Sequence, residues 1–245
     1  MAFQTIFQRY ELKFMLTEEQ RQRLLAHVEP YMKLDKYGHS TIRNIYFDTP
    51  SYLLIRRSIE KPAYKEKLRI RSYTQVGHED TVFVELKKKY RSVVYKRRID
   101  LPEQEAMDWT CGRAPCTKQT QITREIDYVL SYYEGLAPAV FLSYEREAFK
   151  ERGGGDFRMT VDENILYRTE DLSLCSDVYG TPILPEGHVL LELKCSGGLP
   201  LWMLEFLSKE KIYKTSFSKY GTAYRMIHAQ KLAKIDKEKD KEKVL

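Results

Sequence analysis

The most regular feature of the chain is a set of short segments in which polar and apolar residues alternate. In residues 190–194, Glu192 and Lys194 fall on one face of a strand and two leucines on the other, because successive strand side chains point to opposite sides. The same charged face recurs in Glu11 and Lys13; Lys67, Arg69 and Arg71; Glu85, Lys87 and Lys89; Lys96 and Arg98; and Arg158 and Asp162. The recurrence predicts a sheet with a charged face, which is either solvated on the outside or curled around a polar interior.

This alternation predicts strands over residues 7–15, 41–48, 67–73, 81–88, 92–101, 140–149, 156–165 and 189–195, with an edge piece near Leu172. Apolar residues at helical spacing predict helices that begin at Thr17 and cover 102–109, 122–133, 199–207 and 221–235. Thr17 and Gln20 form a capping box at the first of these helices. Short connections between neighbouring strands, including the glycine turn 153–155, favour antiparallel pairing.

Length and composition narrow the setting. A chain of 245 residues can bury a sizeable core in one domain. The sequence contains no internal repeat or interdomain linker, so we predict a single domain over residues 1–235 and a charged, disordered tail over 236–245. Charged residues make up 31% of the chain and the net charge is +6, which favours an anionic partner. Polyphosphate, a nucleotide, nucleic acid and an anionic membrane all satisfy that condition.

Cysteine, histidine and hydropathy patterns exclude other settings. The four cysteines and five histidines lack zinc-type spacing, so we expect free thiols in a reducing cytoplasm and assign no histidine to a metal. No apolar run approaches the roughly 20 residues that a membrane-spanning helix needs. The first residues lack a signal-peptide pattern, and we therefore expect a soluble, cytoplasmic protein.

The charged face itself restricts the chemistry. If the apolar face packs on helices and the sheet closes, the charged face becomes the lining of the interior. Buried cations then require water or a polyanion for compensation. A carboxylate aimed at a phosphate is repelled by on the order of 4 kcal/mol at about 4 Å with an effective dielectric of about 20. Glu192 is explained if a divalent metal ion lies between it and phosphate oxygens.

An ordered set of strings carries a resemblance to a known family: RYELKFML, IYFDTP, KLRIRSY, VFVELKKK, LSYEREAF, DFRMTVDENI, LLELKCSG and FSKYGTAYR. Together they resemble the catalytic domain of the vacuolar transporter chaperone (VTC) family, which belongs to the triphosphate tunnel metalloenzymes (CYTH-like). The resemblance covers roughly residues 5–230. It implies an α+β fold, an eight-stranded antiparallel β-barrel that forms the triphosphate tunnel, with flanking helices.

The resemblance also implies an activity. Members of this branch are metal-dependent polyphosphate polymerases that transfer the terminal phosphoryl group of ATP to a growing polyphosphate chain. The implied cofactor is Mn²⁺ or Mg²⁺, and the implied partners are ATP and polyphosphate. No nucleic acid is expected, and since the chain has no membrane span of its own, any link to a membrane requires a membrane-protein partner.

By position in these strings, the resemblance assigns functional roles to basic residues, one serine and one glutamate. The implied catalytic residues are Lys13, Arg69, Arg71, Lys87, Arg146, Arg158 and Lys194. The implied phosphate- and polyphosphate-binding residues are Lys96, Arg98, Ser218 and Lys219. Glu192 is the implied metal ligand.

Two positions depart from the family pattern. Triphosphatases of this superfamily carry a glutamate where this chain has Arg9, which leaves Glu11 and Lys13 and favours the polymerase branch. Ser216 stands where a basic residue is expected, and Lys214 is the candidate to replace it. Two alternatives stay open: a tunnel triphosphatase, in which water attacks the phosphate, and a non-catalytic protein that binds a polyanion or RNA, with aromatic residues stacked on bases.

Overall fold

The computed structural model describes residues 10–91 and 93–242, so Arg9 lies outside the described residues. The strands are β1 (Tyr10–Thr17), β2 (Met32–Asp48), β3 (Tyr64–Ser72), β4 (Thr81–Tyr90), β5 (Val93–Pro102), β6 (Ala137–Glu151), β7 (Arg158–Arg168), β8 (Thr181–Pro182), β9 (His188–Cys195) and β10 (Lys214–Thr215). The helices are α1 (Glu18–Val28), α2 (Leu53–Glu60), α3 (Glu103–Thr110), α4 (Gln121–Tyr132), α5 (Leu201–Lys209) and α6 (Lys219–Glu242). The predicted capping box of Thr17 and Gln20 is confirmed at the start of α1.

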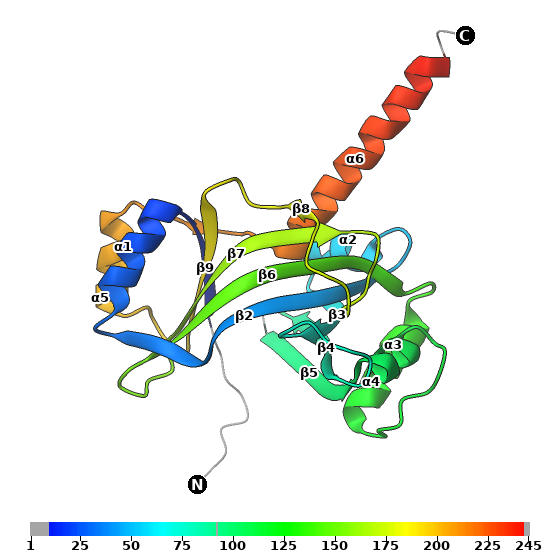
Figure 1. The fold of residues 1–245 in the computed structure, drawn as a ribbon, viewed down its shortest axis with the longest axis horizontal. Helices are drawn as coiled ribbons and strands as arrows, with labels where there is room; N and C mark the ends of the chain where they lie inside the picture. Colours follow the sequence, from blue (N-terminus) through cyan, green and yellow to red (C-terminus); the bar gives the residue numbers. More distant parts are fainter. Residues whose placement is uncertain (1–9, 92, 243–245) are drawn as a thin grey trace.

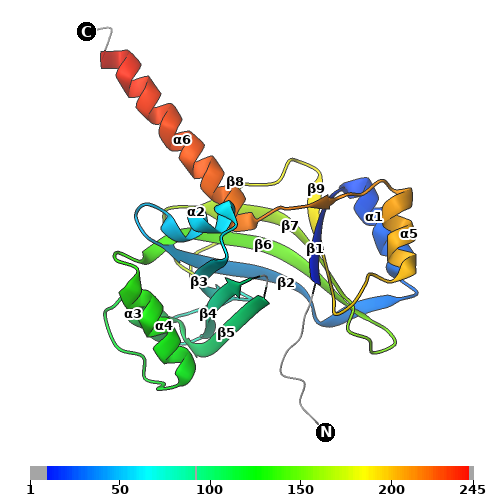
Figure 2. The ribbon, with the colours of Figure 1, turned by 180° about the vertical axis from the view of Figure 1, so that it is seen from behind.

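The strands form one sheet of ten strands in the order β10-β1-β9-β7-β6-β2-β3-β4-β5, with β8 paired to β7. The described pairs are antiparallel. Long strands β2, β6 and β7 cross the middle of the molecule, with β1 and β9 toward one end and β3, β4 and β5 toward the other (Figure 1, Figure 2). The predicted antiparallel sheet with flanking helices is confirmed. The predicted eight-stranded closed barrel is corrected, because the described hydrogen-bonded ladder ends at β10 and β5.

The sheet curls so that its two ends act on each other electrostatically. Desolvation lowers the pKa of Lys87 on β4, while Glu11 on β1 acts in the opposite direction. Lys13 on β1 contributes to the lowered pKa of Lys67 on β3. Because charges act strongly only over about 10 Å in salt solution, this coupling shows that β1 lies near β3 and β4. We call the side of the sheet that carries these charged residues the inner face.

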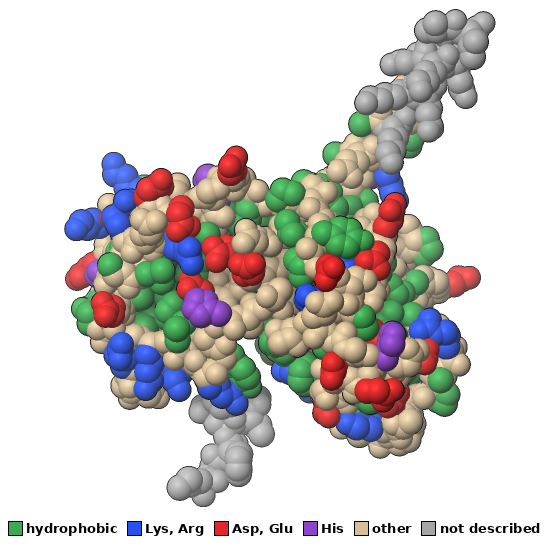
Figure 3. Space-filling model, viewed as in Figure 1, with side chains coloured by type: hydrophobic (Ala, Val, Ile, Leu, Met, Phe, Trp, Pro, Cys, Tyr) green, Lys and Arg blue, Asp and Glu red, His purple; other side chains and the backbone are tan. Residues whose placement is uncertain are grey.

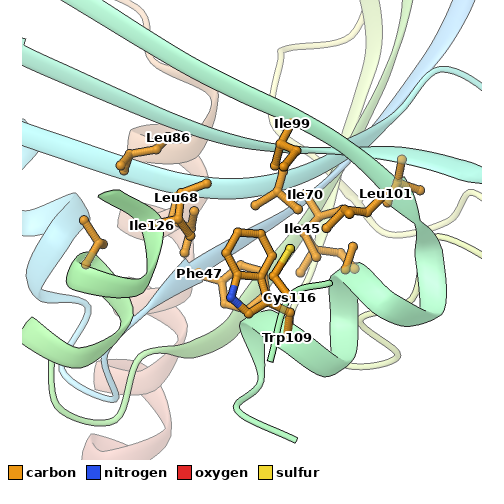
Figure 4. Packing of buried hydrophobic residues seen from close by; sticks show 14 of the residues in the cluster. Ile45, Phe47, Leu68, Ile70, Leu86, Ile99, Leu101, Trp109, Cys116 and Ile126 are labelled. Carbon is orange, nitrogen blue, oxygen red and sulfur yellow. The ribbon is translucent and has the colours of Figure 1, made fainter. Parts of the chain in front are cut away.

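The outer face of the sheet is apolar and carries two helical layers. On one half, α3 and α4 cover β2 to β5, and Leu68 and Leu86 of the strands pack with Trp109 and Ile126 of the helices (Figure 4). On the other half, α1 and α5 cover β1, β7 and β9 with a second buried cluster. The alternation in the sequence therefore places its apolar half under helices, and its charged half on the inner face.

A third apolar cluster lies at one end of the inner face, where α6 begins. Ile42 and Leu142 of the strands pack there against Tyr220, Ala223 and Ile227 of α6. Beyond this contact α6 projects away from the sheet (Figure 1). The packing fixes the first turn of α6, which carries Lys219, against the charged part of the inner face.

The described elements differ from the predicted ones in several places. Residues near Leu172 form a loop, and the edge strand is β8 at Thr181–Pro182. Helix α6 extends to Glu242, into the tail that the sequence predicts to be disordered, and residues 243–245 lie outside the described residues. Helix α2 was not predicted at all. Within the described part of the chain, no helix has the length and apolar character needed to cross a membrane.

The core beneath α3 and α4 makes a testable contribution to stability. Leu68 is 0% exposed, so Leu68→Ala removes buried methyl groups and leaves a cavity, and we expect the free energy of unfolding to fall by about 2–5 kcal/mol. The matched control is Leu204→Ala on α5, where the side chain is 45% exposed and a change within about 0.5 kcal/mol is expected. Urea unfolding followed by circular dichroism measures both. Equal losses in the two variants would contradict the assigned core.

Candidate functional site

Glu192 on β9 is the centre of a group of cations on the inner face. Glu192 is buried, with 6% of the residue exposed. One oxygen, Oε1, lies 3.3 Å from Lys13 Nζ and 3.1 Å from Lys219 Nζ. The other, Oε2, lies 3.4 Å from Lys194 Nζ and 3.6 Å from Arg146 Nη2. Burial alone would raise the pKa of Glu192, but these four cations hold it well below its usual range, so the carboxylate is ionised at neutral pH.

Asp162 on β7 is a second carboxylate in the same group. It is 0% exposed and accepts two hydrogen bonds from Arg146, from Nε at 2.6 Å and from Nη2 at 2.7 Å. Lys219 donates to both Asp162 and Glu192, so it bridges the two acids. Burial acts to raise the pKa of Asp162, but Lys219 and Arg146 lower it overall. Thr160 lies directly opposite Glu192 in the register, and its buried Oγ1 has no hydrogen-bond partner among the described residues.

Glu85 on β4 organises the cations of the other half of the inner face. Its Oε2 accepts from Arg69 Nε at 2.8 Å and Nη2 at 2.6 Å, and its Oε1 lies 2.7 Å from Lys96 Nζ. Arg71 and Arg98 each place Nε 3.9 Å from the same carboxylate. Burial acts to raise the pKa of Glu85, but Arg69, Arg71 and Lys96 lower it to about 2. The predicted basic residues of β3 and β5 are therefore held by one acid.

Tyrosine and asparagine side chains orient the two arginines of β3. Arg69 Nη1 donates to the Tyr46 hydroxyl at 2.9 Å, and Arg71 donates to Asn44 Oδ1 at 2.8 Å and to the Tyr144 hydroxyl at 3.2 Å. Burial acts to raise the pKa of Tyr46, but the neighbouring cations Arg69, Arg71 and Lys67 lower it to about 8. These bonds fix the guanidinium planes before any ligand arrives.

Two lysines between these groups carry uncompensated charge. Lys67 on β3 lies directly opposite Lys87 on β4, and among the described residues neither has an acidic partner within 4.0 Å. Desolvation lowers the pKa of Lys67 to about 8; Tyr46 opposes the shift, and repulsion from Lys87, Lys65 and Lys13 adds to it. Burial and neighbouring cations disfavour the protonated form of these lysines, so an anionic ligand that pairs with them stabilises their charge.

The two halves of the inner face therefore differ in charge. The β3–β5 half gathers basic residues around Glu85: Lys67, Arg69, Arg71, Lys87, Lys96 and Arg98. The other half brings Glu11, Asp162 and Glu192 together with its cations. The face of the molecule drawn in Figure 3, by contrast, mixes acidic, basic and apolar side chains. We interpret the β3–β5 half as suited to phosphates and the Glu192 half as suited to phosphates with a cation.

Most of the residues implied by the resemblance come together in these two groups. Arg158 is exposed and lies opposite Lys194, without an ion pair among the described residues. Ser218 Oγ accepts from the Gly221 amide at 3.2 Å, so its hydroxyl caps the start of α6. Their roles toward phosphate stay predictions.

The pairing register of β10 shows on which side of the sheet Lys214 lies. This residue lies opposite Phe14, a buried residue of the outer-face core, whereas Thr215 lies opposite Lys13. Because directly opposed residues share a face of the sheet, Lys214 lies on the outer side, and Thr215 is its inner-face neighbour. Lys214 therefore lies away from the cations of the inner face, and its role in place of a basic residue at Ser216 stays a prediction.

Sequence reasoning assigned no role to several residues of the site. Asp162 and Glu85 occupy the same alternating positions as the cations, so strand alternation alone indicates that both acids lie on the charged face. Tyr144 likewise lies two residues before Arg146, and Tyr46 lies opposite Arg69. Their functions as charge partners depend on neighbours that are distant in sequence.

The donor set of the Glu192 group fits a hard divalent cation. Glu192 is an ionised oxygen donor, and the Thr160 hydroxyl beside it is buried without a partner among the described residues. Mg²⁺ and Mn²⁺ are bound in this way, through one or two carboxylates, waters and substrate phosphates. Four cations around Glu192 oppose a metal that arrives alone, so phosphates that neutralise those cations favour its binding.

Comparison with solved structures defines the class of fold. A candidate adenylate cyclase from Bacillus halodurans is similar over 85% of this chain and 92% of its own, with 17% identity and a TM-score of 0.53. A candidate adenylate cyclase from Vibrio parahaemolyticus matches over 90% of this chain and 99% of its own, with 12% identity and a TM-score of 0.46. A search of the curated proteins gives no significant match. The first likeness shows that this chain and the Bacillus halodurans protein share a fold.

The family follows from the sequence. The model of the VTC domain matches residues 8–228, which is most of the chain. The chain belongs to the VTC domain family. The family resemblance stated from the sequence strings is thereby confirmed.

The lowered pKa values predict a pH-dependent affinity for inorganic tripolyphosphate. Lys67, with a pKa of about 8, attracts phosphate only when protonated, and Tyr46, also with a pKa of about 8, repels it when ionised. Below pH about 7, Lys67 is charged and Tyr46 is neutral, and both states favour phosphate binding. Both states are lost as the pH rises through about 8, so we expect affinity to fall about three- to tenfold by pH about 9. Isothermal titration calorimetry measures this.

The matched variants separate these groups from the ligand's own ionisation. Lys67→Arg keeps its charge over the whole range, and Tyr46→Phe cannot ionise. The double variant keeps the pH dependence that comes from ionisation of the ligand itself, and because the ligand becomes more anionic as the pH rises, its affinity is expected not to fall between pH about 7 and pH about 9. A double variant whose affinity falls as steeply as that of the wild type would show that other groups are responsible.

Proposed function

We propose that the protein is a metal-dependent polyphosphate polymerase, which transfers the terminal phosphoryl group of ATP to a growing polyphosphate chain. The observation that carries the proposal is the arrangement of the inner face. The ionised, buried Glu192 lies among four cations on one half, and an excess of basic side chains around Lys67 and Lys87 lies on the other. Membership of the VTC domain family supports the same conclusion.

The basic residues of β3 to β5 would bind the phosphates of the substrate. Arg69 and Arg71 present planar guanidinium groups that are held by Glu85, Tyr46 and Asn44, and such groups bind phosphate oxygens bidentately. Lys67 and Lys87 add point charges without acidic partners among the described residues. Phosphoryl transfer requires mainly positioning and charge neutralisation, and these residues supply both.

Glu192 would hold the divalent metal, Mn²⁺ or Mg²⁺, with Thr160 beside it. When bound, such an ion neutralises charge on the phosphate oxygens and on the leaving group. Lys219 and Arg146 keep Glu192 and Asp162 ionised and in place. Lys13 and Lys194, which pair with Glu192 at 3.3 and 3.4 Å, are placed to turn to the substrate phosphates.

The state of the carboxylates favours a phosphate nucleophile over water. The end of a polyphosphate chain is already anionic and needs no general base. Attack by water gains from a base with a pKa near neutrality. The buried acids of the inner face, Glu85, Asp162 and Glu192, have lowered pKa values and cation partners, so they are poor bases. These carboxylates are therefore unsuited to activate water, and Lys67 and Tyr46, with pKa values of about 8, are the inner-face groups that would serve as the base in the alternative of a tunnel triphosphatase.

The test is incubation of purified protein with ATP and Mn²⁺ or Mg²⁺, followed by gel analysis of polyphosphate with ADP and free phosphate measured in parallel. Glu192→Gln keeps the shape of the side chain but removes its charge, so we expect polymer formation to fall at least about a hundredfold, because charge stabilisation at a phosphoryl-transfer site is worth several kcal/mol. Nucleotide binding is expected to persist in part.

Glu145→Gln is the matched control, because Glu145 adjoins Arg146 in β6 but points to the other face and is exposed. Wild-type rates in Glu192→Gln would remove the metal role from this residue. Free phosphate without polymer would identify a triphosphatase, and the absence of any turnover would favour a polyanion-binding protein.

A further inference from the structure

Outside the inner face, three side chains that ligate metals converge near the start of α3. His78 comes from the turn between β3 and β4, Glu103 is the first residue of α3, and Cys175 lies in the loop between β7 and β8. His78 Nδ1 lies 2.9 Å from Glu103 Oε2 and 3.9 Å from Cys175 Sγ. Their ligand atoms all lie within 4.8 Å of one another. We propose that His78, Glu103 and Cys175 form a zinc-type metal site.

The spacing of the three ligand atoms suits a tetrahedral ion. Zinc binds sulfur at about 2.3 Å and histidine nitrogen or carboxylate oxygen at about 2.0–2.2 Å. Tetrahedral angles then place the ligand atoms roughly 3.3–3.7 Å apart. The nitrogen–oxygen distance of 2.9 Å lies below that range and the nitrogen–sulfur distance of 3.9 Å lies above it, so binding of the ion would require rotations of these side chains. His78 is exposed, which leaves the fourth position open to water.

The backbone holds His78 and Glu103 together. The Glu103 amide donates to the Asp80 carbonyl at 2.9 Å, and the Gln104 amide donates to the His78 carbonyl at 2.9 Å. The carboxylate of Glu103 is buried, so it cannot turn to bulk solvent. The turn and the helix therefore present their two ligands as a fixed pair.

The loop that carries Cys175 is fixed from the opposite side. Arg43 on β2 donates to the carbonyls of Ser176 at 2.6 Å and Leu174 at 3.4 Å. Leu174 is fully buried in the core under α3 and α4. Because both neighbours of Cys175 are anchored, its thiol keeps its direction toward His78.

The donors indicate which ions this site selects. A thiolate with an imidazole and a carboxylate favours zinc over Mg²⁺ or Mn²⁺, which prefer oxygen ligands. The ion would join three segments that are far apart in sequence, so its expected contribution is to the stability of this end of the molecule. The site is separate from Glu192 in both position and chemistry.

Cobalt(II) reports directly on a thiolate ligand. The full-length protein is treated with a chelator and titrated with Co²⁺, and we expect a thiolate-to-cobalt charge-transfer band in the near ultraviolet that saturates at one equivalent and disappears when Zn²⁺ is added. Oxygen ligands at Glu192 give no such band. Cys175→Ser is expected to abolish it, and Cys111→Ser, which changes another half-buried thiol at the edge of the same core, is expected to keep it.

Thermal unfolding provides an independent reading. Zinc is expected to raise the Tm of the wild type and of Cys111→Ser by a few degrees, and to leave His78→Ala unchanged. His78 is an exposed side chain, so this variant should fold even if Cys175→Ser does not. Absence of a thiolate band in the wild type, or a band that survives in both Cys175→Ser and His78→Ala, would overturn the proposal.

Discussion

Compensation of buried charge is the constraint on which this structure depends. Basic side chains crowd the inner face of the sheet, and Glu85, Asp162 and Glu192 neutralise part of their charge in the absence of any ligand. Removing one member of a buried ion pair leaves an isolated charge, which costs several kcal/mol. The acids therefore keep the cations folded inward and hold them at defined positions. A polyanion that enters meets groups already aimed at it, which is the condition for strong electrostatic stabilisation.

The outer face makes this arrangement possible. Helices α1, α3, α4 and α5 cover the apolar side of the same strands, so the strands that carry the charged groups have a dry core on one side and these groups on the other. Asp48, at the end of β2, links helices α2 and α6 to the sheet. Its carboxylate accepts from the amides of Leu54 and Ile55 at the start of α2, and from the Tyr220 hydroxyl of α6. Lys219, next to Tyr220, is thereby held between the acids of the site.

Much of the fold could be predicted from alternation, because period-two patterns and short turns are local signals. The strands β1 to β7 and β9, the antiparallel pairing and the helix cap at Thr17 follow from residues within a few positions of each other. Helix α2 could not be predicted in this way. It begins after Tyr52 in the left-handed conformation, without a cap of its own, and its first amides are satisfied by Asp48 from the preceding strand.

The site was predictable only in part, for a similar reason. Alternation placed Lys13, Arg69, Glu192 and their neighbours on one face, and the family strings indicated their role. Which acid each cation meets depends on the register between strands that are distant in sequence, and so does the outward position of Lys214. The proximity of His78, Glu103 and Cys175 likewise cannot be predicted from residue spacing, because they come from three separate segments.

The open edges at β5 and β10 give the sheet a mechanical property that a sealed cylinder would lack. Among the described strands, no ladder of hydrogen bonds joins the two ends, and charged side chains of β1, β3 and β4 act on one another between them. Repulsion between the cations there opposes a close approach of the two ends, and a polyanion that neutralised both sides would remove that repulsion. In an open sheet of this kind, a bound polyanion would therefore lower the electrostatic cost of bringing the two ends together.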